Sequence, residues 1–191
     1  VDEIYGKKVI DLMPDGLIAV NKDAGGHAGK LSSKDLIQRL KAITDLPIIS
    51  AGGVGNGIQL WEKLEEGACG ISMGSPFIAS EESPVSQSYK QACIDYSAKD
   101  IIMTTKLSGT PCTVINTPYV QKTGTHQNLL EAFFSKNRRF KKFTKMLMFY
   151  YGMKSLKKAA FDSTYQNVWC AGPSIEFVKE ILPIKKIVEN L

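Results

Sequence analysis

The stretch Pro47-Ile-Ile-Ser-Ala-Gly-Gly-Val-Gly-Asn-Gly57 decides the fold of this chain. It begins with a short apolar run without polar alternation, which is typical of a strand buried on both faces of a parallel sheet. A pair of glycines follows the run directly and leads into a helical segment. Similar runs, each with glycines after it, occur at Gly16–Val20 and Cys69–Met73. The three runs therefore predict strands of one parallel sheet.

Helical segments separate these apolar runs. Residues 33–41 and 58–66 repeat apolar side chains at helical spacing, so each segment has one face suited to packing on a sheet. Residues 2–12 are expected to form another helix ahead of the first run. Alternation of helices with buried strands indicates parallel βαβ units and an α/β fold. The side chains expected to pack inward are Leu36, Ile37 and Leu40 in one helix and Leu60, Trp61 and Leu64 in the other.

The pattern changes after residue 75. We expect a helix over 83–98, a short strand over 100–105 and a loop-rich connection over 107–124. Beyond these, the chain is expected to be helical over 126–160 and again over 175–190. The changes predict three regions, which are βα units over 1–98, a connection over 99–125 and a helical region over 126–191.

Composition excludes several classes of protein. The 191 residues are 43% hydrophobic and 23% charged, which is in the globular range, and no apolar run approaches the roughly 18 residues of a membrane span. The first residues show no secretory signal. The cysteines are far apart and form no C-x-x-C pair, which argues against a disulfide scaffold and against a metal site. We therefore expect a reduced, cytoplasmic chain, with its thiols at Cys69, Cys93, Cys112 and Cys170.

The basic residues are concentrated in one stretch. The net charge is +5, yet nine Lys or Arg and no Asp or Glu fall between Ala132 and Phe161. A basic amphipathic helix over 136–158 could bind an acidic partner, a membrane surface or nucleic acid. No nucleic-acid motif accompanies the charge, so nucleic acid ranks last. The simpler interpretation is a surface helix whose aromatic side chains pack inward and whose lysines are solvated.

Glycines that follow two neighbouring runs are candidates for binding phosphate. Gly52 and Gly53 come directly after one strand and before a helix, where backbone N–H groups can hold an anion without a basic side chain. They could equally form only a tight turn. Gly74 and Ser75 end the next strand and would add a second N–H group and a hydroxyl. Paired phosphate loops after adjacent strands are the arrangement of (β/α)8 barrels.

His27 is the candidate for acid–base chemistry. It lies just beyond the C-terminal end of the first expected strand, on the side where barrel enzymes place their reactive groups. An imidazole can take up or release a proton near neutral pH. The flanking Gly25 and Gly26 leave room for a flat ligand against the backbone. The alternative is a loop histidine with only local hydrogen bonds, which the neighbouring phosphate loops make less favourable.

Taken in order, these motifs resemble the nitronate monooxygenase family, formerly called 2-nitropropane dioxygenase, which includes the FMN-type enoyl-acyl carrier protein reductases. The resemblance rests on Ala24-Gly-Gly-His-Ala-Gly29, Pro47-Ile-Ile-Ser-Ala-Gly-Gly-Val54 and Gly67-Ala-Cys-Gly-Ile-Ser-Met-Gly-Ser75. Later stretches, Ser108-Gly-Thr-Pro111 and Ala171-Gly172, are also similar to the family pattern. The similarity covers essentially the whole chain.

The resemblance implies an FMN-binding (β/α)8 TIM barrel. The chain would begin in the helix before strand 6 and hold about strands 6 to 8 with a helical C-terminal region. Such a part is expected to bind FMN weakly by itself and to turn over no substrate. The resemblance, with the glycine loops above, implies that FMN contacts Ala24, Gly25, Gly26, Ser50, Gly52, Gly53, Gly74 and Ser75.

The implied activity is FMN-dependent oxidation of nitronates or nitroalkanes with molecular oxygen, with His27 as the base for neutral nitroalkanes. An NAD(P)H-dependent enoyl-acyl carrier protein reductase is the alternative enzyme, and its acidic carrier protein would suit the basic stretch 136–158. An inactive barrel fragment that acts as a binding or scaffold module is the alternative of another class. The physiological substrate, the NAD(P)H requirement and assembly into a homo-oligomer stay open.

Three stretches depart from the family pattern. Asp23 stands where the family usually has Glu, so its carboxylate is one methylene shorter. Ser75 and Pro76 stand where Thr and Arg are usual, which keeps a hydroxyl and removes a guanidinium. Thr113, or no residue at all, takes the place of another usual arginine. These changes alter the side chains that the resemblance would place at the site.

Overall fold

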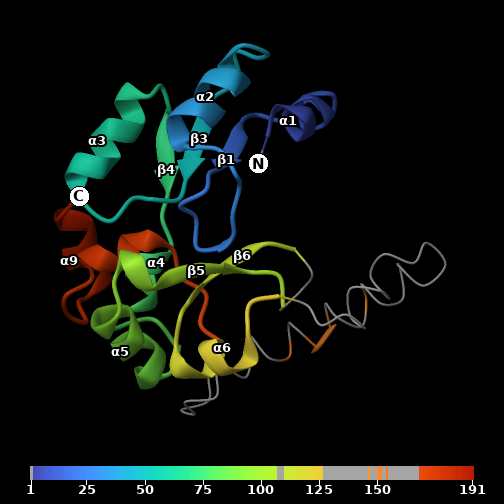
Figure 1. The fold of residues 1–191 in the computed structure, drawn as a ribbon. Helices are drawn as coiled ribbons and strands as arrows, with labels where there is room; N and C mark the ends of the chain where they lie inside the picture. The colour runs from blue at the N-terminus through green and yellow to red at the C-terminus, as the bar shows by residue number, and fades with distance from the viewer. Residues whose placement is uncertain (1, 107–109, 127–145, 147–149, 152–153, 155–167) are drawn as a thin grey trace.

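Two small sheets and the helices around them organise the part of the chain that the structure describes (Figure 1). One sheet is parallel and the other is antiparallel, and the two contribute different parts of the candidate site. No helix among the described residues is long and apolar enough to cross a membrane. The computed structural model describes residues 2–106, 110–126, 146, 150–151, 154 and 168–191.

The parallel sheet has the strand order β1-β3-β4. Its strands are β1 (Leu17–Val20), β3 (Ile48–Ala51) and β4 (Gly70–Ser72), which confirms the three apolar runs as parallel strands. Because neighbouring strands pair in parallel along their lengths, their C-terminal ends lie at one edge of the sheet. The glycine-containing loops that follow the strands therefore meet at that edge.

Helices α1 (Glu3–Ile10), α2 (Ser33–Lys41) and α3 (Gly57–Glu65) confirm the three predicted helical segments. Each begins after a residue whose side chain accepts a hydrogen bond from a backbone N–H three positions later, which satisfies a donor that the first turn leaves unpaired. These capping residues are Asp2, Ser32 and Asn56.

Helix α2 supplies much of the core behind the parallel sheet. Leu36 and Ile37 are completely buried, and Leu40 is nearly so. They pack in one cluster with Leu17 of β1 and Ile48 of β3. Burial of each such side chain contributes roughly 1.5–3 kcal/mol relative to exposure, so this contact fixes the helix on the sheet.

Helix α3 differs from the sequence prediction, because its apolar side chains are not buried. Trp61 keeps 62% of its surface exposed, and Ile58 and Leu64 are also exposed. No residue of α3 is buried. The spacing correctly predicts a helix with an apolar face. Among the described residues that face is not buried, whereas the apolar face of α2 is.

The antiparallel sheet joins distant segments in the order β2-β6-β5. Its strands are β2 (Gly26–His27), β6 (Cys112–Ile115) and β5 (Ile101–Thr104). The sequence predicts β5, whereas β2 is read as part of a loop. The loop-rich interpretation of residues 107–124 is wrong for β6 and for helix α6 (Pro118–Thr123), which begins at the cap Thr117.

The remaining elements pack below the parallel sheet in the view of Figure 1. The helix expected over 83–98 is shorter in the structure, where it is α5 (Gln87–Asp95). The 3₁₀ turn η1 (Ala98–Asp100) follows it. The segment expected to be helical over 175–190 contains a 3₁₀ turn and one short helix. The other elements of this region are α4 (Ser75–Ile78), η2 (Pro173–Phe177) and α9 (Ile184–Glu189).

Two sequence-based expectations stay predictions. The helix over 126–160 and the basic stretch 136–158 fall outside the described residues, apart from residues 146, 150–151 and 154 and the first position, 126. The division of the chain at residues 98 and 125 also stays a prediction. Pairing of β2 with β6 does bring the first region and the connection into one sheet.

Candidate functional site

A cavity of about 530 Å³ opens at the C-terminal ends of the parallel strands. Val20, Ala51 and Ser72, each the last residue of its strand, line this cavity together with the loops that follow. Open and closed α/β sheets alike place ligands at this end, where loops from several strands converge. The candidate site therefore combines an apolar floor from the strands with backbone groups from the loops.

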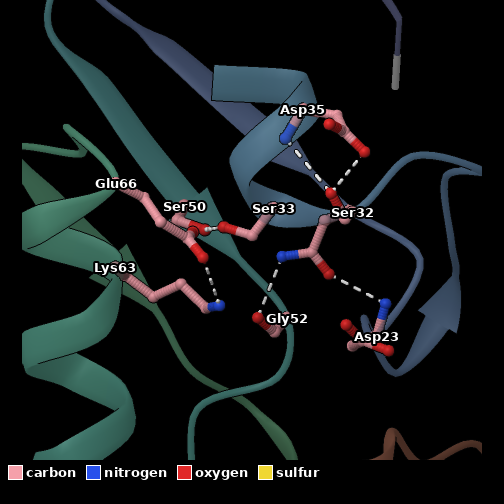
Figure 2. Close-up of polar contacts among 9 residues, drawn as sticks. Asp23, Ser32, Ser33, Asp35, Ser50, Gly52, Lys63 and Glu66 are labelled. Carbon is pink, nitrogen blue, oxygen red and sulfur yellow. Dashed lines mark hydrogen bonds and ion pairs between the residues drawn. The ribbon is translucent and has the colours of Figure 1, made fainter. Parts of the chain in front are cut away.

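The cavity gathers most of the residues that the sequence singles out. Gly26 and Ser50 are not among its lining residues. Ser50 is fully buried, and its hydroxyl lies 2.9 Å from the hydroxyl of Ser33 on α2 (Figure 2). Side chains alternate along a strand, so Ser50 faces the helix while the next residue faces the cavity. The predicted residues that line the cavity are Ala24, Gly25, His27, Gly52, Gly53, Gly74 and Ser75.

The glycine loop after β3 has a backbone shape that other residues adopt only with strain. Gly52 has φ +107° and Gly53 has φ +77°. A Cβ at Gly52 would lie 2.4 Å from the backbone nitrogen of Ala24, whereas a Cβ at Gly74 would meet nothing within 4 Å. Gly52 is therefore required for close packing of two loops, and Gly74 borders open space.

Backbone N–H groups in these loops are suited to holding an anion. Within the described part of the chain, the N–H groups of Gly53 and Gly74 donate no hydrogen bond. Each lies in a loop that directly follows a parallel strand and lines the cavity. An N–H group without a protein acceptor can donate to a phosphate or carboxylate oxygen instead.

Asn21 joins the two loops at the site and was missed by the sequence interpretation. Its side chain is completely buried, and its amide nitrogen donates to the Gly52 carbonyl at 3.0 Å. Its amide oxygen accepts from the Asp23 N–H at 2.8 Å. A buried amide that bonds two backbone segments fixes their spacing. A lone Asn after a strand carries no distinctive sequence signal for this role.

The loop that carries His27 is held from the antiparallel sheet. Thr113 of β6 is buried, and its hydroxyl donates to the Ala24 carbonyl at 2.7 Å and approaches the Gly26 carbonyl at 3.3 Å. His27 itself pairs with Cys112 in the β2–β6 register. Thr113, noted above as a departure from the usual arginine, therefore supports the backbone on both sides of Gly25.

The C-terminal segment completes the wall of the cavity. The N–H of Gly172 donates to the Ser75 hydroxyl oxygen at 2.9 Å, so this hydroxyl keeps its own hydrogen for a ligand. A Cβ at Gly172 would lie 2.7 Å from the Asp23 carbonyl oxygen and 2.9 Å from the Gly25 nitrogen. Gly172 thus lets this segment touch both loops of the site.

Tyr89 of α5 and Cys170 form a part of the wall that no sequence motif marked as a site. The Tyr89 hydroxyl donates a hydrogen bond to the Cys170 carbonyl, and its ring stacks on Trp169 with centroids 5.7 Å apart. Burial, and after it the nearby thiols of Cys170 and Cys93, raises the pKa of Tyr89 well above its ordinary value. The hydroxyl therefore remains a donor throughout the neutral range.

The donors at the cavity suit the phosphate of a flavin nucleotide. The described residues contain no group of three or more His, Cys, Asp or Glu side chains placed to hold a metal ion. The cavity offers instead an apolar floor at the strand ends. Its anion donors are the N–H groups of Gly53 and Gly74 and the Ser75 hydroxyl. These residues fit FMN, whose phosphate needs donors and whose ring needs an apolar surface.

Comparison with known proteins identifies the same family that the sequence motifs resemble. The family model for nitronate monooxygenase matches residues 4–191. A Rhodococcus jostii protein named as a 5-hydroxy-7a-methyl-1-oxo-octahydro-1H-indene-4-carboxyl-CoA dehydrogenase is 29% identical over 86% of this chain and 47% of its own length. A probable nitronate monooxygenase from Staphylococcus saprophyticus is 30% identical over 56% of this chain and 34% of its own length. The chain thus spans less than half the length of these relatives.

Solved structures show the same fold. FabK from Thermotoga maritima is 25% identical, with a TM-score of 0.79 over 100% of this chain and 57% of its own. The nitroalkane oxidase of Streptomyces ansochromogenes is 21% identical, with a TM-score of 0.75 over 97% of this chain and 52% of its own. The parallel sheet and the helices between its strands are therefore part of a TIM barrel, as the sequence predicts.

Proposed function

The chain belongs to the nitronate monooxygenase family, and we propose that it forms the FMN-binding and proton-transferring part of an oxidoreductase that oxidises nitronates or nitroalkanes with molecular oxygen. The observation that carries this proposal is that His27 lines the same cavity as the glycine loops after β3 and β4. Because the chain spans less than half of the relatives above, the reaction is proposed for the complete barrel.

The proposed cofactor site uses donors that have no acceptor among the described residues. The N–H groups of Gly53 and Gly74 and the hydrogen of the Ser75 hydroxyl would donate to the phosphate of FMN. Ala24 and Gly25 line the cavity and would lie against the flavin. Thr113 and Gly172 hold the backbone of these two residues in place. When bound, FMN supplies an acceptor for substrate electrons and passes them to oxygen.

His27 would move the proton. A neutral nitroalkane must lose a proton from the carbon beside the nitro group before it can be oxidised, and a His27 ring nitrogen would take it. A nitronate has already lost this proton and does not need the base. His27 is exposed at the cavity and is held in β2 by pairing with β6, so its backbone is fixed while its ring stays reachable.

Substitution of His27 by glutamine tests this role in the protein that carries the complete barrel. His27→Gln is expected to lower kcat/KM for a neutral nitroalkane by roughly 100-fold or more, and to lower it much less for the nitronate, because only the neutral substrate needs the base. Oxygen consumption measures both reactions. His126→Gln is the matched control, since His126 does not line the cavity.

Two outcomes would contradict the proposal. Equal losses for nitroalkane and nitronate would show that His27 does not act as the base. A purified protein that has no flavin absorbance and takes up no added FMN would remove the cofactor on which the reaction depends. The visible absorption spectrum of the purified protein is therefore the first measurement.

A second candidate reaction uses an acyl thioester. The Rhodococcus relative is named for a carboxyl-CoA substrate and matches 86% of this chain, whereas the staphylococcal relative matches 56%. An NAD(P)H-dependent enoyl thioester reductase would use the same FMN site. Oxidation of NADH that depends on an enoyl thioester, without oxidation of a nitronate, would favour this reaction over the first.

A further inference from the structure

Ser174 is a buried serine in the wall of the cavity whose hydroxyl has no partner among the described residues. It lies in η2, is only 5% exposed and lines the cavity. Its hydroxyl oxygen is not one of the described side-chain atoms that are both sealed from solvent and unpartnered, so it is open to the cavity. Buried hydroxyl groups in proteins are normally hydrogen-bonded. An open, unpartnered hydroxyl in a cavity wall is therefore a candidate to bind a ligand.

The residues on each side of Ser174 fix its position. Ile175 is completely buried and packs in one apolar cluster with Tyr89 and Trp169. On the other side, the N–H of Gly172 donates to the Ser75 hydroxyl oxygen at 2.9 Å. A donor that the fold already holds in place loses little conformational entropy when a ligand binds. Ser174 thus has a defined position before any ligand enters the cavity.

The 3₁₀ turn η2 also packs directly against the glycine loop after β3. A Cβ at Gly55 would lie 2.7 Å from the Phe177 side chain and 3.0 Å from the Ser174 carbonyl oxygen. Gly55 follows Gly53, whose N–H has no acceptor among the described residues, by two positions. Three segments therefore meet at this part of the cavity, namely the loop after β3, the loop after β4 and η2.

The charges at the cavity make each neutral donor important. No Lys or Arg occurs among the described residues that line it, and its acidic side chain is Asp23. Pro76 stands where the sequence resemblance leads one to expect an arginine. A phosphate in this cavity must therefore be held by backbone N–H groups and hydroxyls rather than by a cation. Hydrogen bonds to an ionised group are stronger than those between neutral groups, so one additional hydroxyl has a measurable effect on affinity.

We propose that the Ser174 hydroxyl donates a hydrogen bond to the phosphate of FMN, and that η2 thereby completes the phosphate site formed by the two glycine loops. This inference rests on the proposed function, because it needs FMN in the cavity. It adds a donor from a segment that lies far along the chain from both loops. It also assigns Ser174 a role in selecting FMN over riboflavin, which has the same ring and no phosphate.

The test is a binding titration of the flavin-free protein that carries the complete barrel. Flavin fluorescence gives the dissociation constants of FMN and of riboflavin, and neither depends on turnover. Ser174→Ala is expected to weaken FMN binding roughly tenfold, because a hydrogen bond to a charged group is lost, and to change riboflavin binding by less than about twofold. Ser80→Ala is the matched control, since Ser80 is a buried serine that does not line the cavity, and it should leave both constants within about twofold.

A second variant reverses the interaction instead of removing it. Ser174→Asp should weaken FMN binding roughly 100-fold, because its carboxylate repels the phosphate, and should affect riboflavin much less. The inference is overturned if Ser174→Ala binds FMN as tightly as the unsubstituted protein, or if it loses FMN and riboflavin equally, which would indicate altered packing. Absence of FMN binding in the unsubstituted protein would overturn the proposed function as well, so the two failures can be told apart.

Discussion

The parallel and the antiparallel sheet differ in how their strands find their partners. In the parallel sheet, one helix separates β1 from β3 and another separates β3 from β4, and every strand lies in a short, largely apolar run of the sequence. In the antiparallel sheet, the two-residue strand β2 pairs with β6, far along the chain. The parallel sheet supplies the glycine loops, and the antiparallel sheet positions the loop that carries His27.

This difference shows that two kinds of information build one site. Local patterns in the sequence locate the loops that follow parallel strands. Long-range pairing of β2 with β6 decides where the loop that carries His27 lies relative to the glycine loops. The position of this loop depends on hydrogen bonds such as the one from the Thr113 hydroxyl to the Ala24 carbonyl. The comparison can be tested by weakening each sheet's contribution separately.

The largest effect is expected where two loops touch. Gly52→Ala should lower the free energy of unfolding by about 3 kcal/mol, because φ +107° strains any other residue and the added Cβ would meet the Ala24 backbone at 2.4 Å. Urea denaturation measures this loss. The matched control is Gly74→Ala, whose Cβ meets nothing within 4 Å and should change stability by less than about 0.5 kcal/mol. Equal losses in both variants would contradict the packing described here.

An intermediate effect is expected where the antiparallel sheet supports the loop. Thr113→Val keeps the side-chain shape but removes the hydroxyl that donates to the Ala24 carbonyl, so a loss of about 1–2 kcal/mol is expected. Thr104→Val on β5 is the control, since the Thr104 hydroxyl donates to the Thr125 carbonyl, away from the site. Both should lose similar stability, but only Thr113→Val should slow the reaction that needs His27. Equal kinetic effects would show that the loop does not depend on β6.

The smallest effect is expected on the outer helix of the parallel sheet. Trp61→Ser should change the unfolding free energy of this chain by less than about 0.5 kcal/mol, because the Trp61 side chain is largely exposed. By contrast, Leu36→Ala in α2 should cost about 3 kcal/mol, since Leu36 is fully buried. Urea denaturation of the two variants measures both changes in the free energy of unfolding. A large loss for Trp61→Ser would contradict the exposed position of the Trp61 side chain.

The sequence predicted those parts of the fold whose signal is local. Helix α2 occurs over the residues expected, because a cap at Ser32 and an apolar face act within the same few turns. The three parallel strands were found because each lies in a short, largely apolar run that glycines follow. Strand β2 could not be found in this way, since Gly26 and His27 have no strand preference and pair only because β6 is beside them.

The candidate site was predicted to a similar extent and for the same reason. The glycine loops and His27 were indicated by their positions after strands, and the structure brings them to one cavity. Ser50 was placed with them although strand alternation turns its side chain toward Ser33. Asn21 and Tyr89 were missed because their roles depend on partners elsewhere in the chain, which no local pattern encodes. The predicted roles in FMN binding stay predictions.

The position of Gly172 has a consequence for the order in which the protein is made. A ribosome adds residues from the N-terminus, so all the strands of the parallel sheet leave it well before Gly172 does. Until then, the Ser75 hydroxyl lacks the N–H that Gly172 donates, and the backbone of Gly25 lacks its close contact with Gly172. A nascent chain can thus form its sheet early, while the wall of the cavity closes only after Gly172 has been added. Ligand binding by growing chains should therefore begin abruptly, at the length where Gly172 emerges.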